Sequence, residues 1–527
     1  MGHQSNRSVD AVIVGSGMNS LVCAALLARG GRKVLVLERE GVLGGCIRTD
    51  ELTLPGFRHD TLSTAHPLFM VGPAYAALGK ALHAAGLEYC NTDEPTGVLL
   101  PDGRHLVLST SRERNLQRLG VDGAAFAGAL GEVATQAPLL FSLLGNELWR
   151  LSTAKSLASA AWKQGPHALA GFFGDALTPA RAWLEQTFAS DLPGALLAPW
   201  VLHCGLGPDA PLSALMAKVV AFTLEAVGMP MVKGGSANIV RAFETLIRDA
   251  GGAWETGADV ERVIVERGRA VGVRLAGGHE VRAGEVICNV TPTQLYGRLL
   301  DPATVPPEVA AQSKRWRYGK GNLQIHLALS EAPRWPNSEL DRVAYLHLSA
   351  GPSAVSRAVN EAERGLLPAE PTICLAQPTA LDPTRAPEGR HILWIQLPEC
   401  PREPVGDAAG EIDVPAGGRW TEALRETYAD RVIERIARHV PNLQSSILGR
   451  AVLSPVDLQQ LNMNLVGGDP YGGDCSLDQS FLWRPLRALR NHTTPVQHLW
   501  HIGASTHPGP GLGGGSGFHL AQTLGAT

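Results

Sequence analysis

The chain has 527 residues, of which 45% are hydrophobic and 18% are charged, and its formal net charge is −4. These values are typical of a globular protein with roughly two or three domains, and they exclude a broad basic surface for nucleic acid. The first ten residues, MGHQSNRSVD, lack the apolar core of a signal peptide, and we find no apolar run of membrane-spanning length. The eight cysteines are scattered without metal or disulfide spacing. We therefore expect a cytoplasmic protein that acts on small molecules and holds no metal.

The N-terminal segment predicts a strand, a tight turn, a helix and a second strand. Residues 11–14 are apolar, a helical pattern follows, and a second apolar run covers residues 33–37. The turn carries Gly15-x-Gly17-x-x-Ser20. The first glycine permits the bend, the second lets a pyrophosphate approach N–H groups at the helix N-terminus, and Ser20 stands where a small residue allows close helix packing. The spacing predicts a dinucleotide-binding βαβ unit.

Two features after this unit distinguish between the candidate dinucleotides. Glu38 ends the second strand, where a carboxylate can accept hydrogen bonds from ribose hydroxyls and repels a 2′-phosphate, which favours FAD or NAD over NADP. Gly44 and Gly45 follow shortly afterwards, and a glycine pair lets the chain pass close to the middle of a long cofactor. An NAD site has no need of this pair, so the sequence predicts FAD.

The C-terminal segment predicts a second contact with the cofactor. Residues 501–525 read HIGASTHPGPGLGGGSGFHLAQTLG, in which an apolar strand over residues 497–502 leads into a glycine-rich loop and a helix that begins near Ser516. Free N–H groups in such a loop and at the helix N-terminus stabilise negative charge. In an FAD enzyme this charge develops on the edge of the flavin as it is reduced. We therefore expect this loop to close on the flavin.

Two further regions lie between these ends. Residues 253–283 predict three short alternating strands, and residues 286–289 predict another buried strand, as in a small antiparallel layer inserted into the nucleotide-binding sheet. Residues 124–232 are rich in Ala, Leu, Phe and Trp with helical periodicity, which predicts a helical cap. A cap this apolar would suit a hydrophobic substrate.

These motifs, in this order, resemble the FAD-dependent phytoene dehydrogenase-like family, the bacterial-type carotenoid desaturases and their relatives, within the amine-oxidase-like flavoprotein group. The likeness spans nearly the whole chain, and its most specific stretches are GSGMNSLVCAALLARGG (15–31), EREGVLGG (38–45), PGFRHD (55–60) and GASTHPGPGLGGGSG (503–517). The stretch SPVDLQQLNMNLVGGDPYGGD (454–474) resembles the branch of pyridine nucleotide-disulfide oxidoreductase domain proteins.

The resemblance implies a set of cofactor-binding residues. Many relatives carry Arg where this chain has Cys46, so Arg48 is the candidate substitute for that phosphate contact, and Gly513 stands where a bulkier residue is usual and would enlarge the space beside the flavin. The set comprises Gly15, Gly17 and Ser20 around the diphosphate, Glu38 on the adenosine ribose, Arg39 along the adenine, Gly44 and Gly45 as the second glycine pair, Val260 with its backbone near the adenine, and Gly503, Gly514, Gly515 and Gly517 in the loop that closes on the flavin.

The fold implied is α/β, with a Rossmann-like FAD-binding domain of the glutathione-reductase type, an inserted mixed-sheet substrate domain and an α-helical cap. The FAD-binding domain is expected in three pieces, residues 1–75, 233–300 and 480–527. The substrate domain is expected over residues 76–123 and 301–479, and the cap over residues 124–232.

Catalysis on such a flavoprotein needs residues that orient the substrate, and a base is a further candidate role, because the cofactor accepts the hydride. The candidates with titratable side chains are His59, Asp60, His66, His203, Lys320, His326 and His507. We select His507, Lys320 and His59. His507 lies in the loop expected to close on the flavin, and Lys320 resembles the lysine that holds a water near the flavin in amine oxidases.

The leading functional hypothesis is an FAD-dependent dehydrogenase or desaturase that moves a hydride from a C–C or C–N bond of a hydrophobic small molecule to flavin N5. Two alternatives stay open, a flavin-dependent isomerase without net oxidation and a non-enzymatic prenyl- or lipid-binding protein of the same fold. The electron acceptor (oxygen, quinone or another carrier) and homo-oligomerisation are also open. The carotenoid branch implies peripheral membrane contact, for which Trp149, Trp162, Trp183 and Trp200 are candidates.

Overall fold

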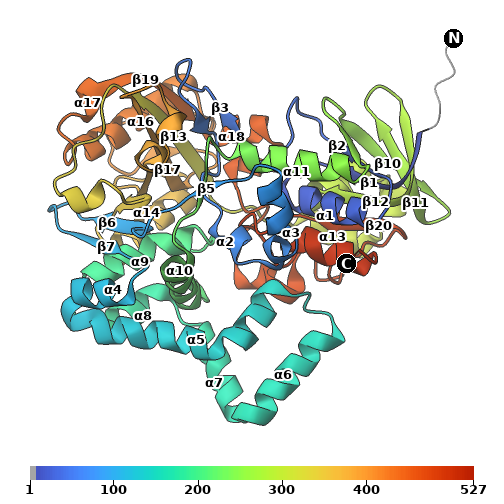
Figure 1. Cartoon of the computed structure of the whole chain (residues 1–527), viewed down its shortest axis with the longest axis horizontal. Helices are drawn as coiled ribbons and strands as arrows, with labels where there is room; N and C mark the ends of the chain where they lie inside the picture. The colour runs from blue at the N-terminus through green and yellow to red at the C-terminus, as the bar shows by residue number, and fades with distance from the viewer. Residues whose placement is uncertain (1–6, 527) are drawn as a thin grey trace.

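The structure, a computed structural model, describes residues 7–526 and places two large sheets side by side with a helical region packed below one of them (Figure 1). The first sheet comes from both ends of the chain and from a central segment, as the blue, light green and red strands of Figure 1 show. The second sheet comes mainly from the C-terminal half. This arrangement confirms the predicted fold class.

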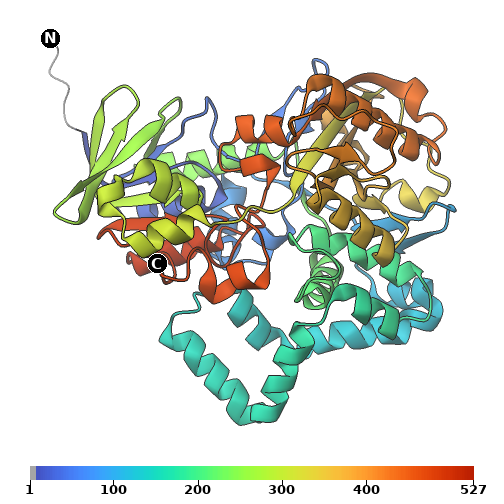
Figure 2. The same ribbon diagram turned by 180° about the vertical axis from the view of Figure 1, so that it is seen from behind.

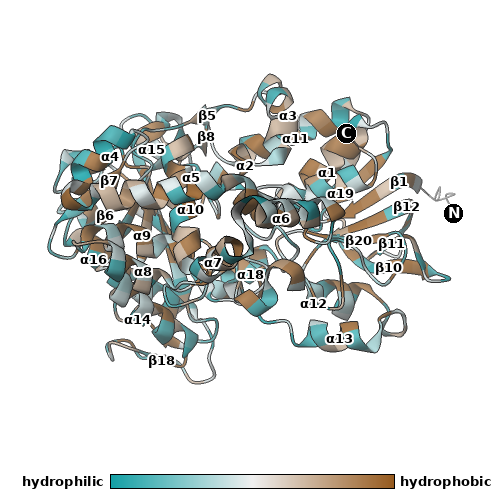
Figure 3. Ribbon diagram, turned by 90° about the horizontal axis from the view of Figure 1, so that it is seen from below, coloured by the Kyte–Doolittle hydropathy of each residue, from teal (hydrophilic) through white to brown (hydrophobic). Residues whose placement is uncertain are grey.

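The first sheet has a parallel core in which strands distant in sequence lie next to one another. The paired segments of these strands are apolar and brown in Figure 3, because one face packs on helices and the other packs on the hairpin over residues 260–275 and on residues 295–309. The N-terminal β-strand is followed by α1 (Met18–Arg29), as predicted. The core runs in the order β9 (Ala253–Glu255), β2 (Val34–Leu37), β1 (Arg7–Val14), β12 (Glu280–Asn289) and β20 (Leu499–Ile502).

The antiparallel layer differs from its prediction in two ways. Residues 253–255 join the parallel core as β9 instead of the hairpin. Residues 286–289 are the end of one long strand, β12, whose first residues pair with β11 (Arg269–Leu275) and whose last residues pair with β20. The hairpin therefore has only β10 (Val260–Glu266) and β11, attached to the first half of β12.

Three helices pack together beside the first sheet. They are α1, α11 (Ala237–Asp249) and α19 (Gly515–Thr523), and their apolar residues form one buried cluster with Ile13, Val36 and Ile502. The last helix of the chain thus lies against the first, which brings the glycine-rich C-terminal loop next to the N-terminal turn (Figure 1).

The second sheet is mixed, as predicted for the substrate domain. Its outer face packs on α16 (Glu422–Ala437), and its inner face packs on helices of the cap. Only the β14–β6 pair is parallel within it. The order is β19 (Ile447–Leu453), β13 (Gly321–Leu329), β17 (His391–Cys400), β16 (Ile373–Ala376), β14 (Tyr345–Leu348), β6 (Thr96–Leu99) and β7 (His105–Leu108).

The helical region has a packed part and a projecting arm. Three helices, α8 (Ala180–Thr187), α9 (Leu192–Leu202) and α10 (Ser213–Val227), share a core with the second sheet. In contrast, α6 (Leu151–Gln164) and α7 (Pro166–Ala176) extend away from both sheets in Figures 1 and 2, joined to the body through α5 (Gly123–Gly145).

The four tryptophans expected at a membrane rim fall into two groups. Trp162 is 91% exposed on the arm and Trp149 lies beside it at 47%, so both remain surface candidates. Trp183 and Trp200 are 9% and 6% exposed within the core between the cap and the second sheet. The prediction was wrong for these two, because apolar helical periodicity does not distinguish a core face from a surface face.

One described helical stretch, Arg112–Gly145, is long and apolar enough to cross a membrane by length and composition alone, although our sequence prediction found none. It comprises α4 (Arg112–Leu119), a short 3-10 turn and α5. Part of it packs in the core through Leu119, Phe126 and Leu130. Such a stretch is weak evidence for a membrane span, because core helices of soluble proteins have the same composition.

The remaining elements connect these layers. The other α-helices are α2 (Pro67–Met70), α3 (Pro73–Ala84), α12 (Pro292–Gln294), α13 (Pro307–Lys314), α14 (Pro352–Glu363), α15 (Pro378–Leu381), α17 (Leu443–Ser446) and α18 (Pro455–Leu461). The short strand pairs are β3 (Thr49–Asp50) with β4 (His59–Asp60), β5 (Tyr89–Cys90) with β8 (Met231–Val232), and β15 (Leu366–Leu367) with β18 (Gly406–Asp407).

Candidate cofactor and substrate site

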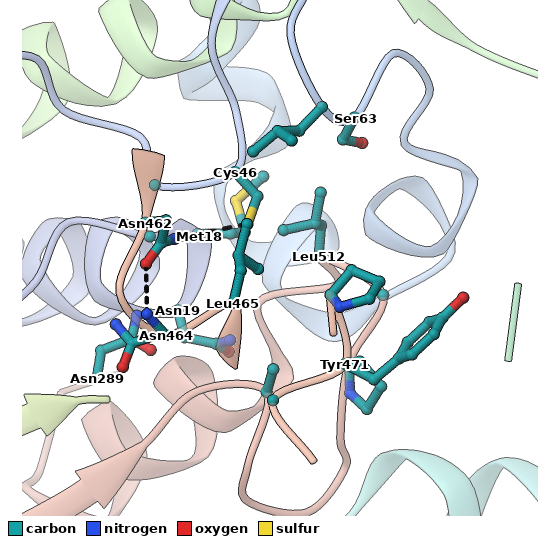
Figure 4. Close-up of a pocket in the computed structure, with 18 of the residues that line it drawn as sticks. Met18, Asn19, Cys46, Ser63, Asn289, Asn462, Asn464, Leu465, Tyr471 and Leu512 are labelled. Atoms are coloured by element: carbon teal, nitrogen blue, oxygen red, sulfur yellow. Dashed lines mark hydrogen bonds between the residues drawn. The ribbon is translucent and has the colours of Figure 1, made fainter. Parts of the chain in front are cut away.

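A cavity of about 400 Å³ begins at the carboxyl ends of the parallel strands and continues to the inner face of the second sheet. Figure 4 shows side chains from both ends of the chain around it, including Met18, Asn19, Cys46, Asn289 and Leu512. Ligands of open parallel sheets bind outside the carboxyl ends of the strands. The cavity therefore lies where the fold places a dinucleotide.

The two predicted glycine motifs meet at this edge. Gly15 has a φ of +86°, and Gly17 caps the N-terminus of α1. Gly17 forms a bridge to Gly44, and a Cβ on Gly45 would lie 3.2 Å from the Gly17 Cα. Gly15, Gly17 and Gly45 line the cavity, whereas Gly44 lies behind them. Backbone N–H groups at the α1 N-terminus are thus open to an anion, with no side chains in the way.

Glu38 is held in place by hydrogen bonds from the same turn. Its side chain lines the cavity but is only 7% exposed. One carboxylate oxygen accepts from the backbone N–H of Ser16 (2.9 Å) and from its hydroxyl (2.6 Å), and the other accepts from the Glu40 N–H (3.0 Å). The Ser16 hydroxyl accepts in turn from the Gly44 N–H (2.9 Å). This network fixes the acid where a ribose would lie.

Two other predicted residues, Arg39 and Val260, line the cavity. The Arg39 guanidinium lies 2.9 Å from Glu40 and contacts the Met463 sulfur (3.0 Å). The Val260 carbonyl accepts from Arg298 (3.0 Å).

Arg48 also lines the cavity, but its guanidinium pairs with Asp50 at 2.6 Å, so a phosphate would compete with this carboxylate. Cys46 lines the cavity beside Asn462, whose amide donates to the cysteine sulfur at 3.7 Å (Figure 4).

The other predicted glycines support the cavity from behind. Gly503, Gly514, Gly515 and Gly517 do not line it. A Cβ at Gly503 would overlap the Asn289 amide oxygen, and one at Gly517 would overlap the Asn19 carbonyl. Ser20 is likewise buried and accepts a hydrogen bond from the Asn289 amide (2.9 Å). The loop contributes residues 504–505 and 509–512 to the cavity wall instead.

None of the three selected catalytic candidates lines the cavity. The Lys320 ammonium lies 3.8 Å from Glu363. His59 contacts the Thr53 hydroxyl (2.8 Å), and burial lowers its pKa to about 2. His507 packs beside Phe481, and burial lowers its pKa to about 3. Their catalytic roles stay predictions, because each would have to act through a neighbouring group.

The remaining titratable candidates separate into a buried ion pair, two buried rings and one cavity residue. Asp60 and Arg385 are both 1% exposed at their side chains and lie 3.0 Å apart. Asp60 also accepts from the Ser236 N–H (2.8 Å), which indicates a structural brace. His66 and His326 are buried outside the cavity, whereas His203 lines it.

The far end of the cavity is a chamber between the cap and the second sheet. Aromatic rings of Trp200, Tyr345 and Trp394 form part of its wall. From the sequence we named Trp200 only as a candidate for a membrane rim, and we missed Tyr345, Trp394 and the loop over residues 462–465, although the motif that contains this loop was quoted. The aliphatic part of the wall comprises Met216, Val219, Val220, Leu224 and Met229.

One group of three residues in the described part of the chain has metal-ligand chemistry. Ligand atoms of His203, His347 and Cys374 lie within 4.8 Å of one another. A ligating histidine normally donates a hydrogen bond from its second ring N–H to a carboxylate or carbonyl, but Nδ1 of His347 has no partner among residues 7–526. We therefore interpret the 3.0 Å contact between the two Nε2 atoms as a hydrogen bond between histidines.

Comparison with known proteins gives the family. The family model for flavin containing amine oxidoreductases matches residues 21–435, well over half of the chain. The chain belongs to this family. It is therefore an FAD-dependent oxidoreductase, and the hypothesis of a cofactor-free binding protein is not retained.

The flavoprotein resembles curated proteins over nearly its full length. Pyridine nucleotide-disulfide oxidoreductase domain-containing protein 2 of Rattus norvegicus is 29% identical over 98% of this chain and 93% of its own. A zeta-carotene-forming phytoene desaturase of Myxococcus xanthus is 26% identical over 95% and 90%. A crystal structure of an oxidoreductase from Methanosarcina mazei shares the fold, with a TM-score of 0.59, 16% identity and coverage of 98% and 99%.

The residues of the flavoprotein fit FAD. A Cβ at Gly45 would come within 3.2 Å of the turn that receives the diphosphate, and the buried Glu38 carboxylate faces the position of a ribose. Gly15, Gly17 and Gly45 would hold the diphosphate, Glu38 the ribose and Val260 with Arg39 the adenine end. The flavin would then lie toward residues 504–505, 509–512 and the aromatic chamber.

Proposed function

We propose that this flavoprotein is a dehydrogenase or desaturase that removes a hydride from a C–C or C–N bond of a hydrophobic small molecule. The observation that carries the proposal is the continuity of one cavity from the cofactor turn to a chamber walled by Trp200, Tyr345 and Trp394. Largely apolar concave sites suit apolar substrates. The likeness to a phytoene desaturase supports the same substrate class.

Bound FAD supplies a two-electron acceptor for a hydride, and a C–C single bond becomes a double bond when the neighbouring carbon also releases a proton to water. The two electrons then leave to an acceptor such as oxygen or a quinone. The chain's own residues orient the substrate. Trp200 and Trp394 are fixed for this, since their indole N–H groups donate to Thr96 (3.1 Å) and to the Leu62 carbonyl (3.2 Å).

Anaerobic mixing with candidate substrates tests the proposal. A panel of polyenes, cyclic ketones and amines should contain a compound that bleaches the flavin band and is recovered with one more double bond. Turnover without any acceptor would instead identify a redox-neutral isomerase. Met216→Trp fills the chamber and should abolish bleaching by the substrate without lowering the FAD content. The control Val121→Trp, at an 83% exposed position, should leave both the bleaching and the FAD content unchanged.

We also propose that the protein is cytoplasmic and touches a membrane surface through its arm. Leu151 and Trp162 are 72% and 91% exposed on α6, and Phe173 is exposed on α7. Exposed apolar and aromatic side chains gathered on one projection favour insertion at the boundary of headgroups and acyl chains. This contact would bring the chamber close to a substrate dissolved in lipid.

A further inference from the structure

A row of polar side chains crosses the inner face of the second sheet. Strand register pairs Gln324 with Gln396, Gln396 with Cys374, and Cys374 with His347, so these four residues lie side by side on β13, β17, β16 and β14. Directly paired residues point to the same face, and three strand spacings give the row a length of roughly 14 Å. This row faces the cap.

The neighbouring residues on the same face are aromatic. Two positions further along the strands, Trp394 pairs with His326, and Tyr345 lies across from Ala376. The opposite face of β13 carries Leu323, Ile325 and Leu327, which pack in the outer core. Polar residues therefore alternate with apolar ones along β13 as on a solvated strand, although this polar face is covered by the cap.

Two buried amides at one end of the row have no hydrogen-bond partner among the described residues. Gln324 is 2% exposed and Asn322 is 1% exposed, and both line the cavity. Their amide oxygens are buried without a hydrogen bond, so the amide nitrogens are the atoms that reach the cavity. Exchanging oxygen and nitrogen would bury an unpaired N–H₂ group instead, which is the costlier arrangement. Buried polar groups are normally paired, so these amides point to a ligand.

The histidine pair at the other end adds a further donor. Nε2 of His203, at the C-terminal end of α9, lies 3.0 Å from Nε2 of His347, and only one of them can carry the shared proton. Nδ1 of His347 is buried and unpaired. An unpaired acceptor costs less than an unpaired N–H, so the proton belongs on Nε2 of His347. His203 then accepts through Nε2 and presents Nδ1–H, which has no partner among the described residues.

The row is uncharged. The ionised residues that line the cavity are at its cofactor end, namely Glu38, Arg39, Glu40, Arg48, Asp259 and Arg298. Burial lowers the pKa of His203 to about 4, and burial and then His203 lower that of His347, so both rings are neutral at pH 7. An ammonium or a carboxylate placed here would lose its hydration without meeting an opposite charge, which is unfavourable.

We propose that the substrate is a neutral, mainly apolar molecule with a carbonyl or hydroxyl oxygen, that Asn322 and Gln324 donate hydrogen bonds to this oxygen, and that His203 is a donor at the other end of the row. The inference rests on the proposed function for the location of the substrate. It narrows the substrate class, since it excludes both pure hydrocarbons and charged amines.

Binding to the oxidised holoprotein tests this inference without turnover. Three probes share one carbon skeleton: isopropylcyclohexane, 4-isopropylcyclohexanone and 4-isopropylcyclohexylamine. Titration is followed by the change in the flavin absorption spectrum. The ketone should bind at least about tenfold more tightly than either of the others, since a site built to hydrogen-bond rejects an analogue without the group. Equal affinities, or preference for the amine, would overturn the inference whether or not a substrate is ever oxidised.

A matched pair of variants tests the row itself. Gln324→Met removes the amide with little change in shape. The variant should bind the ketone with an affinity close to its affinity for the hydrocarbon, so the preference for the ketone should be largely lost. Gln117→Met makes the same change on the exposed surface of α4 and should leave the preference intact. An unchanged preference in Gln324→Met would overturn the inference.

Stability and cofactor content separate a ligand role from a structural one. Because the Gln324 amide has no protein partner, Gln324→Met should melt at the same temperature as the parent or higher, with full FAD content. A melting temperature lowered by several degrees would show that the amide has a structural partner. Loss of FAD would show that it serves the cofactor. Either result would overturn the inference.

Discussion

Replacing Gly517 by alanine tests how the two ends of the chain build the cofactor site. Gly517 lies in α19, where its N–H donates to the Asn19 side chain (3.1 Å) and where a Cβ would overlap the Asn19 backbone carbonyl. Glycine to alanine within a helix normally stabilises by about 0.5–1 kcal/mol. Here α1 and α19 would have to separate, and overpacking of this kind costs about 1–3 kcal/mol. The cost of the overlap should exceed the gain in helix stability, because a backbone carbonyl cannot rotate away as a side chain can.

The assay compares thermal unfolding and FAD affinity in two variants. Gly128→Ala is the control, since Gly128 is also helical, exposed on α5 and has no atom within 4 Å of the added Cβ. We expect Gly128→Ala to be slightly more stable than the parent, and Gly517→Ala to be less stable and to bind FAD more weakly, because Asn19 lines the cavity. If Gly517→Ala matched the control in both measurements, the close approach of the helices would be refuted.

Three further results are expected. Glu38→Gln should weaken FAD binding roughly 10- to 100-fold, since it removes charge-assisted hydrogen bonds worth about 1.5–3 kcal/mol, and an unchanged Kd in fluorescence titration would contradict this. The free energy of unfolding should fall as the pH is lowered from about 6.5 to about 4: burial lowers the pKa of His66, His326 and His501 to about 4, so below pH 6.5 the unfolded chain binds more protons. Glu399, whose pKa burial raises to about 8, opposes this trend, and denaturant titrations of equal midpoint at pH 7 and pH 5 would argue against it. The double variant Leu151→Ser and Trp162→Ser should sediment severalfold less with lipid vesicles, whereas Val405→Ser, at an exposed position away from the arm, should behave like the parent. Equal sedimentation of the parent and both variants would exclude the arm as the contact.

Local patterns were sufficient to predict the cofactor end of the molecule. The glycine turn, the helix after it and Glu38 are adjacent in sequence, and their geometry depends on residues within one βαβ unit. The C-terminal glycines were also placed at the correct edge of the sheet. Their role differs from the prediction, because whether a glycine faces a ligand or a neighbouring helix depends on packing between segments distant in sequence.

The chamber could not be predicted because the strand face that lines it is polar although the cap covers it. In the usual pattern, a polar strand face is exposed to solvent. The stretch GNLQIHLAL alternates as a half-solvated strand would, and nothing in these nine residues shows that the cap covers the polar side. Lys320 and His59 were selected for their chemistry, yet Lys320, one residue before β13, lies near Glu363, and His59 is buried beside His326. Burial and register are both set by contacts across the sheet.

The position of β20 and α19 has a consequence for biosynthesis. Residues 499–523 supply the last parallel strand, the helix against α1 and, between them, part of the cavity wall, so the dinucleotide pocket stays open on one side until this segment has left the ribosome. We therefore expect FAD to bind only after this segment has been synthesised, and nascent chains arrested before residue 499 should lack bound FAD.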